Sequence, residues 1–122
     1  MIYYAHSKRI YGSKREEQEL DFLRSKFEGV VDPNTDMGEL GSIDPYLDVV
    51  TEAEALVVSE FQSHIGKGAF SEVQQALEEQ KPVHALRKGK KGFELVEVKG
   101  LKVVDETDWA VKYGKLVTRN SL

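Results

Sequence analysis

Residues 55–86 read ALVVSEFQSHIGKGAFSEVQQALEEQKPVHAL, and the order of elements in this stretch decides the fold class. The apolar run ALVVSEF has the length of a strand and is typical of a strand covered on both faces. After a glycine-containing loop, AFSEVQQALEEQ predicts a helix that carries Phe70, Val73 and Leu77 on one face. KPVHAL predicts the next strand. A strand, a helix and a strand in this order indicate a parallel pair joined by a right-handed crossover.

The sequence on either side of this unit continues the alternation of strands and helices. Ser13 followed by Glu16 fits a helix-capping box, and the helix that it starts carries Leu20, Leu23 and Phe27 on one face. Further elements are expected as strands at MIYYAH and GVVDP, a helix at DPYLDVVTEAEA, a hairpin at GFELVEVKGLKVVDE that turns at Lys99-Gly100, and a last helix at TDWAVKYGKLV. These elements predict an α/β protein with a mostly parallel, Rossmann-like (flavodoxin-like) sheet, helices on both faces, and a C-terminal hairpin and helix.

The composition is that of an ordinary globular domain. The chain has 122 residues, 40% of them apolar and 31% charged, which predicts one domain with its own core. Its net charge of -4 argues against a nucleic-acid-binding protein, which normally carries a basic field. The absence of cysteine excludes disulfides and thiolate chemistry. No apolar run approaches the ~20 residues that span a bilayer, and no signal-peptide pattern is present, so we expect a cytoplasmic protein without a membrane partner.

Metal binding is not expected from the sequence. The histidines are His6, His64 and His84, and no two of them have the short spacing of metal ligands. Histidines dispersed in this way are more often incidental than ligands. We therefore expect neither a metal nor another cofactor.

The loop after the first predicted strand, HSKRIYGS, is the first candidate for a binding site. In parallel α/β sheets, ligands bind beyond the carboxyl ends of the strands, where this loop lies. Its hydroxyls, two cations and flexible glycine suit an anionic or sugar-like ligand. The candidate residues are His6, Ser7, Lys8, Arg9, Tyr11 and Gly12. A solvated loop that ends in a helix cap is the alternative interpretation.

The loop after ALVVSEF is the second candidate, and it should face the same crevice. Gly66 and Gly68 let the backbone turn tightly and approach a ligand, and Glu72 follows one turn into the helix. A carboxylate there is favoured by the positive end of the helix dipole, so a simple cap is the alternative role of Glu72. Glu60, at the end of the strand, is either a site residue or an ordinary polar strand terminus. The spacing fits neither a Walker loop nor the dinucleotide fingerprint.

Several segments together resemble the nucleoside 2-deoxyribosyltransferase-like superfamily, which includes the deoxyribonucleoside 5′-monophosphate N-glycosidases. These segments are MIYYAHSK, VVDP, TEAEALVVSE and GKGAFSEVQQALEEQKPV. The resemblance is strongest at Gly68 to Glu72 followed by Gln80-Lys81-Pro82-Val83. It covers roughly residues 1–86, which form the family core of the expected single domain at 1–122, whereas the expected hairpin and helix at 92–122 depart from the family.

The resemblance also implies residue roles. Glu72 falls on the family's catalytic glutamate, which attacks the anomeric carbon of a sugar and forms a covalent glycosyl-enzyme intermediate. Ser7 and its neighbours fall on the loop that contacts sugar and phosphate. The family's acid in the helix before the third strand falls on Tyr46, with Asp44 and Asp48 on either side. We expect Asp48 to supply this acid.

Two segments outside the best-matching region have two interpretations each. RKGKKG at residues 87–92 is either a phosphate-binding segment, replacing the family's serine-containing one, or a solvated turn. Trp109 and Tyr113, four apart on the predicted last helix, either stack on a base or pack in a core or dimer interface.

Three functions are compatible with these observations. The first is an N-glycosidic bond hydrolase or transferase acting on a nucleoside or nucleoside 5′-monophosphate. The second is a non-catalytic binder or sensor of nucleotide-derived ligands that uses the same crevice. The third is an interaction module in which the crevice has no use. We expect the first, in a homodimer whose ligand is a small nucleoside or nucleotide and which has no nucleic-acid partner.

Overall fold

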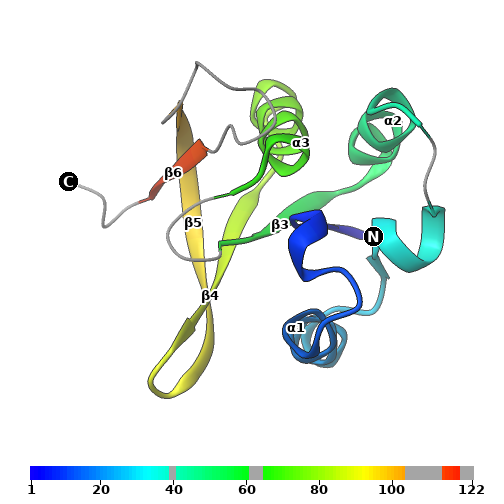
Figure 1. Ribbon diagram of the computed structural model, residues 1–122. Helices are drawn as coiled ribbons and strands as arrows, with labels where there is room; N and C mark the ends of the chain where they lie inside the picture. Colours follow the sequence, from blue (N-terminus) through cyan, green and yellow to red (C-terminus); the bar gives the residue numbers. More distant parts are fainter. Residues whose placement is uncertain (39–40, 61–64, 104–113, 119–122) are drawn as a thin grey trace.

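The computed structural model describes residues 1–38, 41–60, 65–103 and 114–118, and within these ranges six strands form one sheet (Figure 1). The strands are β1 Ile2–Ala5, β2 Val30–Val31, β3 Ala55–Ser59, β4 Val83–Gly89, β5 Gly92–Val103 and β6 Gly114–Thr118. The helices are α1 Lys14–Lys26, α2 Asp44–Glu52 and α3 Lys67–Glu78, with short helical turns at Lys8–Ile10 and Pro33–Met37. The order of strands across the sheet is β2-β1-β3-β4-β5-β6.

The sheet has a parallel part and an antiparallel part. β1 pairs in parallel with β2 and β3, and β3 pairs in parallel with β4, as the alternation of strands and helices predicts. β5 is antiparallel to β4, and β6 is antiparallel to β5. The α/β class is therefore confirmed, but the sheet is mixed and the expectation of a mostly parallel sheet is wrong.

The change of direction after β4 follows from the RKGKKG segment. Gly89 and Gly92 are paired at the end of the β4–β5 ladder, and Lys90 and Lys91 are exposed between them. Such a short connection can only reverse the chain, because a parallel partner needs a crossover of a dozen or more residues. Gly92 supplies a positive φ of 118°, which side chains disfavour. The solvated-turn interpretation of this segment is confirmed.

The expected hairpin at Lys99-Gly100 is wrong, because β5 continues through these two residues as one strand. The first half of β5 pairs with β4 and the second half with β6, and the register shifts between Val98 and Gly100. A glycine inside a strand is typical of such an irregularity. The Lys-Gly signal therefore marks the point where the strand changes partner.

The expected C-terminal helix is wrong for residues 114–118, which form β6. Leu116 and Thr118 are buried while Val117 between them is 38% exposed, which is the alternation of a strand with one covered face. Trp109 and Tyr113, which were expected on this helix, lie outside the described residues.

Helices cover both faces of the sheet, as the sequence predicts (Figure 1). Successive residues of a strand point to opposite faces, so Tyr3 packs on the α2–α3 side and Tyr4 on the α1 side. Buried apolar residues include Val50, Leu56, Val58, Val73 and Ala85 on the first side, and Leu20, Leu23, Val57 and Leu86 on the second. None of the helices in the described ranges combines the length and the apolar surface that a bilayer span requires.

The start of α1 confirms the predicted cap at Ser13. The helix also buries two acidic residues, which its apolar pattern does not predict. The Ser13 side chain accepts a hydrogen bond from the Glu16 amide, as a capping residue does. The face of α1 that meets the sheet carries Glu16 and Glu19 beside Leu20 and Leu23, and all four are buried. Two acids therefore lie in the contact between α1 and the sheet.

Lys81, in the part of the sequence where the family resemblance is strongest, caps the end of α2. Its ammonium donates hydrogen bonds to the backbone oxygens of Val50 at 3.0 Å and of Thr51 and Ala53. A cation is favoured at a helix C-terminus because the carbonyls there are unpaired and carry the negative end of the dipole. This position therefore has a structural role, because it ties the segment before β4 to the end of α2.

We expect Lys81→Met to lower the free energy of unfolding by about 1–2 kcal/mol, because it keeps the aliphatic stem but removes the donor to three carbonyls. Urea denaturation measures this loss. Lys90→Met in the exposed turn is the matched control and should change stability by less than about 0.5 kcal/mol. Equal stabilities of the two variants would contradict the capping role.

Candidate functional site

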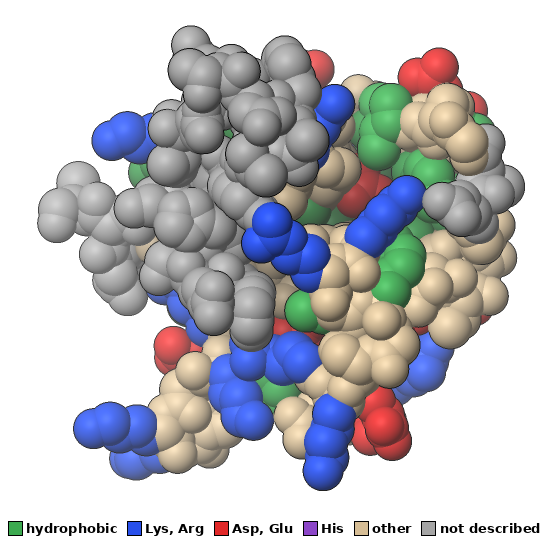
Figure 2. Space-filling model, viewed as in Figure 1, with side chains coloured by type: hydrophobic (Ala, Val, Ile, Leu, Met, Phe, Trp, Pro, Cys, Tyr) green, Lys and Arg blue, Asp and Glu red, His purple; other side chains and the backbone are tan. Residues whose placement is uncertain are grey.

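A cavity of about 280 Å³ lies where the carboxyl ends of β1 and β3 meet the starts of α2 and α3. Its lining consists of His6, Ser7, Lys8, Arg9, Tyr11, Ile43, Tyr46, Gly66, Lys67, Gly68, Ala69 and Glu72. Figure 2 shows a recess on this face in which an acidic side chain is visible beside Lys or Arg side chains. The two loops that the sequence selects therefore converge on one cavity.

Most of the predicted site residues line this cavity, and three do not. The residues in place are His6, Ser7, Lys8, Arg9, Tyr11, Gly66, Gly68 and Glu72. Gly12 instead donates its amide to Glu16 Oε1 at 3.0 Å. Glu60 accepts two hydrogen bonds from Arg87, at 2.6 and 3.2 Å. Asp48 is exposed on α2 and does not line the cavity, whereas Tyr46 does.

Four lining residues were not among the predicted site residues: Ile43, Tyr46, Lys67 and Ala69. Ile43 and Ala69 have apolar side chains that give no signal of a site, whereas Lys67 lies between the two recognised glycines and its charge was an available signal. Tyr46 was aligned with the family's acid but set aside in favour of Asp48. Its spacing of three residues from Ile43, which puts both on one side of a helical turn, was the available signal.

Glu72 is the central acid of the cavity. It lies on α3, is only 5% exposed, and accepts a hydrogen bond on Oε2 from the Tyr3 hydroxyl. Burial raises the pKa of Glu72 to about 7, although the hydrogen bond from Tyr3 acts in the opposite direction. The carboxyl group is therefore close to half ionised at neutral pH. It can act as a nucleophile or exchange a proton without a large energetic cost.

Glu72 does not cap α3. The N-cap position of this helix is Gly66, and no side chain accepts a hydrogen bond from the first turn there. Among the described residues, the Tyr3 hydroxyl is the donor to Glu72, and it bonds to Oε2 and not to Oε1. The structure therefore leaves one carboxylate oxygen of Glu72 for a ligand.

Cations and hydroxyl groups are prominent among the other polar residues of the cavity lining. Lys8, Arg9 and Lys67 bring positive charge, while Ser7 and Tyr11 bring hydroxyl groups. Burial, and then the charge of Glu72, raise the pKa of Tyr11, so its hydroxyl stays protonated and can donate a hydrogen bond. This combination suits a ligand that carries both an anionic group and sugar-like hydroxyls.

The loop after β1 and the loop after β3 touch at Ser7 and Gly66. A methyl group on Gly66 would lie 3.3 Å from Ser7 Oγ, which is closer than most such contacts, whereas a methyl group on Gly68 would meet no atom within 4 Å. The absence of a side chain at Gly66 therefore lets the two loops approach each other beside the cavity.

We expect the cost of Gly66→Ala to depend on Ser7. In a double-mutant cycle, Gly66→Ala should cost about 0.5–1 kcal/mol less in a Ser7→Ala background, because Ser7 Oγ is then absent. The coupling is measured by thermal unfolding of the four proteins. The cycle with Gly68→Ala is the control and should be additive within about 0.3 kcal/mol. Additivity in the Gly66 cycle would show that the loops do not touch.

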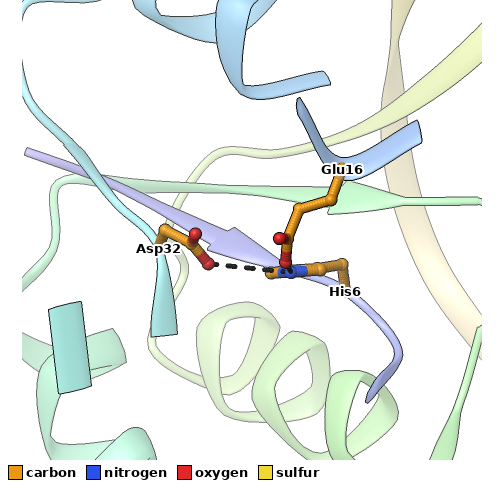
Figure 3. Close-up of side chains that lie close together, drawn as sticks. All are labelled: His6, Glu16 and Asp32. Carbon is orange, nitrogen blue, oxygen red and sulfur yellow. Dashed lines mark hydrogen bonds and ion pairs between the residues drawn. The ribbon is translucent and has the colours of Figure 1, made fainter. Parts of the chain in front are cut away.

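A second polar cluster lies on the α1 side of β1 (Figure 3). His6 Nε2 lies 2.6 Å from Glu16 Oε2 and 3.6 Å from Asp32 Oδ1. All three residues are buried, and each offers one possible metal-ligand atom, with these atoms within 4.8 Å of one another. They come from the end of β1, the first turn of α1 and the residue after β2. The expectation of no metal site rested on spacings and motifs along the chain, which do not show that Glu16 and Asp32 fold next to His6.

A third network joins α1 to the middle of the sheet. Glu19 is fully buried and accepts hydrogen bonds from the hydroxyls of Tyr4 at 2.5 Å and Ser59 at 2.8 Å, and from Arg15 Nε at 2.9 Å. Its acceptor atoms are therefore occupied within the protein. This network is a structural feature of the α1 contact.

Comparison of the chain with protein-family models, with curated proteins and with solved structures finds no match. The fold and the cavity define the class of protein as an α/β domain with a mixed sheet and a cavity, lined in part by three cationic residues, at the carboxyl ends of parallel strands. A buried carboxyl group in that cavity is its main chemical feature.

Proposed function

We propose that this protein cleaves or transfers the N-glycosidic bond of a nucleoside or nucleoside 5′-monophosphate, with Glu72 as the nucleophile. The observation that carries the proposal is a carboxyl group, 5% exposed, in the wall of a cavity whose other polar residues are cations, hydroxyls and His6. A carboxylate placed against a sugar stabilises the positive charge that develops at the anomeric carbon when the base leaves.

A Rossmann-like (flavodoxin-like) assignment of the fold is part of the same proposal. It is supported by the order β2-β1-β3-β4-β5, which is the flavodoxin-like order, and by the position of the cavity at the carboxyl ends of β1 and β3. The antiparallel β5 and β6 then form an addition at one edge of the sheet.

The reaction has two displacement steps. Glu72 Oε1 forms a bond to the anomeric carbon while the bond from that carbon to the base nitrogen breaks. The electron pair leaves with the base, which takes a proton from solvent. Water or a second base then attacks the anomeric carbon, loses a proton to solvent, and releases Glu72 as a carboxylate. The Tyr3 hydroxyl, which donates to Oε2, fixes the orientation of the nucleophile throughout.

The cations of the cavity support a phosphorylated substrate. Lys8, Arg9 and Lys67 all line the space that Glu72 faces. Lysine and arginine bind phosphate oxygens by charge-assisted hydrogen bonds, which a free nucleoside lacks. A nucleoside 5′-monophosphate is therefore the preferred substrate in this proposal.

A non-catalytic binder of nucleotide-derived ligands is the second candidate, and one observation favours it. Among the described residues, Glu72 is the only carboxylate that lines the cavity. Asp48, the expected second acid, is exposed on α2 and does not line it. A second acid near the base would help its departure. A site without that acid can bind the same ligand without cleaving it.

Incubation of the pure protein with a panel of nucleosides and 5′-monophosphates, in ribose and deoxyribose forms, tests both candidates. Chromatography detects the released base, and a second added base reports transfer. Base release from a monophosphate is the expected result. Thermal stabilisation by a monophosphate without base release would support the binder instead. Neither release nor stabilisation would contradict both candidates. The homodimer stays a prediction, which sedimentation of the same preparation checks.

A further inference from the structure

The cluster of His6, Glu16 and Asp32 takes no part in the proposed reaction, and its three side chains lie close together in the interior (Figure 3). The side chains of His6 and Asp32 are fully buried, and that of Glu16 is 7% exposed. Two carboxylates in such surroundings are costly unless a positive charge compensates them. The question is which cation supplies this charge.

The hydrogen bonds of His6 show where the cation must lie. Its Nδ1 atom is 3.2 Å from the backbone oxygen of Tyr4, and because a carbonyl oxygen can only accept, Nδ1 carries a proton. In the neutral ring, Nε2 then has a lone pair directed at Glu16 Oε2, 2.6 Å away. Two electron-pair donors facing each other need a cation between them, either a proton on Nε2 or a metal ion.

Both carboxylates accept hydrogen bonds from neighbouring groups of the protein, as metal-binding carboxylates usually do. Glu16 accepts hydrogen bonds from the Gly12 amide at 3.0 Å and from Asn34 Nδ2, 3.1 Å from each carboxylate oxygen. Asp32 accepts from the Asn34 amide and from the Thr35 hydroxyl, each at 3.0 Å. Such outer partners fix the orientation of the ligands.

We propose that His6 Nε2, Glu16 and Asp32 bind one divalent transition-metal ion, for which Zn²⁺ is the best match. One imidazole and two carboxylates suit Zn²⁺, whereas Mg²⁺ and Ca²⁺ prefer oxygen ligands alone. Ligand atoms at ~2.0–2.1 Å from a tetrahedral ion are roughly 3.3 Å apart. The His6–Asp32 separation of 3.6 Å is close to this value, and the His6–Glu16 pair has to open from 2.6 Å.

Two cavities border the cluster. His6 lines the 280 Å³ cavity of the proposed active site, and Asn34 lines a neighbouring one of about 190 Å³. The ion would join the end of β1, the start of α1 and the segment after β2. It would thereby fix the first loop beside the cavity, whether or not the protein cleaves nucleosides.

Equilibrium dialysis of the full chain, first stripped with EDTA, against Zn²⁺ tests the site. We expect one zinc ion per chain and a rise in the unfolding temperature with zinc concentration. Co²⁺ should give the visible absorption bands of an ion bound to nitrogen and oxygen ligands. His6→Gln and Asp32→Asn should weaken zinc binding by more than about 100-fold, and Asn34→Ala by about 10–100-fold. His84→Gln, on β4, is the matched control and should bind zinc like the wild type.

Circular dichroism establishes which variants fold. If His6→Gln does not fold, Asp32→Asn provides the same comparison. Failure of the stripped wild-type protein to retain zinc would show that a proton alone holds the cluster, and it would overturn the proposal without reference to any variant. Zinc binding that survives both His6→Gln and Asp32→Asn would also overturn it.

Discussion

Glu72→Gln is expected to lower the rate of base release by at least about 10³-fold, because an amide oxygen cannot replace the carboxylate as nucleophile. The variant should fold, since Gln has nearly the same shape and its carbonyl oxygen can still accept from the Tyr3 hydroxyl. Glu54→Gln is the matched control, because the Glu54 side chain is 84% exposed and lies away from the cavity. Equal rates for Glu72→Gln and the wild type would exclude Glu72 as the nucleophile.

The pH dependence of the rate gives this prediction a second readout. A nucleophilic carboxylate must be ionised, and the pKa of Glu72 is about 7. Base release should therefore rise as the pH increases from 5 and level off above about 8. A rate that falls over this range would instead assign Glu72 the role of a general acid.

The stability of Glu72→Gln should change with pH in a defined direction. Because burial raises the pKa of Glu72 from 4.5 to about 7, folding binds a proton between these values. The contribution of Glu72 to stability is therefore complete below pH 4.5 and is lost as the pH rises through 7. Since Gln does not titrate, the variant should gain on the wild type over this window. Relative to the difference between the two proteins below pH 4.5, the variant should gain up to roughly 3 kcal/mol above pH 7, as measured by urea denaturation.

The sequence predicts that the loops after β1 and β3 converge, but it does not predict which side chains contact each other at the site. Carboxyl ends of adjacent parallel strands meet at one edge of a sheet, so Ser7 and Gly66 were placed near each other by topology alone. Tyr3 was not recognised, because its bond to Glu72 depends on the exact seating of α3 on β1. Asp48 failed as a site residue because two residues along a helix turn the side chain by ~200° from Tyr46.

The C-terminal part was harder to predict because its turn signals are ambiguous. Both RKGKKG and Lys99-Gly100 contain the residues that turns prefer, but only the first reverses the chain. Strand pairing decides between a turn and a bulge, and pairing is a long-range property that local sequence does not contain. The same limit applies to Glu16 and Asp32, whose approach to His6 depends on β1, α1 and β2 packing together.

Adjacent tyrosines of β1 bind one buried glutamate on each face of the sheet, and the two pairs differ in how many donors the glutamate has. Tyr3 donates to Glu72, which has no other donor among the described residues and faces the cavity. Tyr4 donates to Glu19, which also accepts from Ser59 and Arg15. A carboxylate with one partner is available for a ligand, whereas one with three partners is committed to the fold. We therefore expect mutation of Glu19 to affect stability much more than ligand binding.

Glu19→Ala should lower the free energy of unfolding by about 3–5 kcal/mol, since it leaves the hydroxyls of Tyr4 and Ser59 unpaired and buried and opens a cavity. Urea denaturation measures the loss, and Glu17→Ala, at an exposed position of the same helix, should cost less than about 0.5 kcal/mol.

The triple variant Tyr4→Phe, Glu19→Leu, Ser59→Ala separates the loss of a hydrogen bond from the cost of an unpaired polar group. It removes the two hydroxyls together with their acceptor, so no buried donor is left without a partner, and Arg15 is partly exposed and can be hydrated. Replacing a buried polar network by apolar groups is often neutral, so the triple variant should recover most of the stability that Glu19→Ala loses. A triple variant as unstable as Glu19→Ala would show instead that the network itself contributes the stability, through the attraction between Glu19 and Arg15.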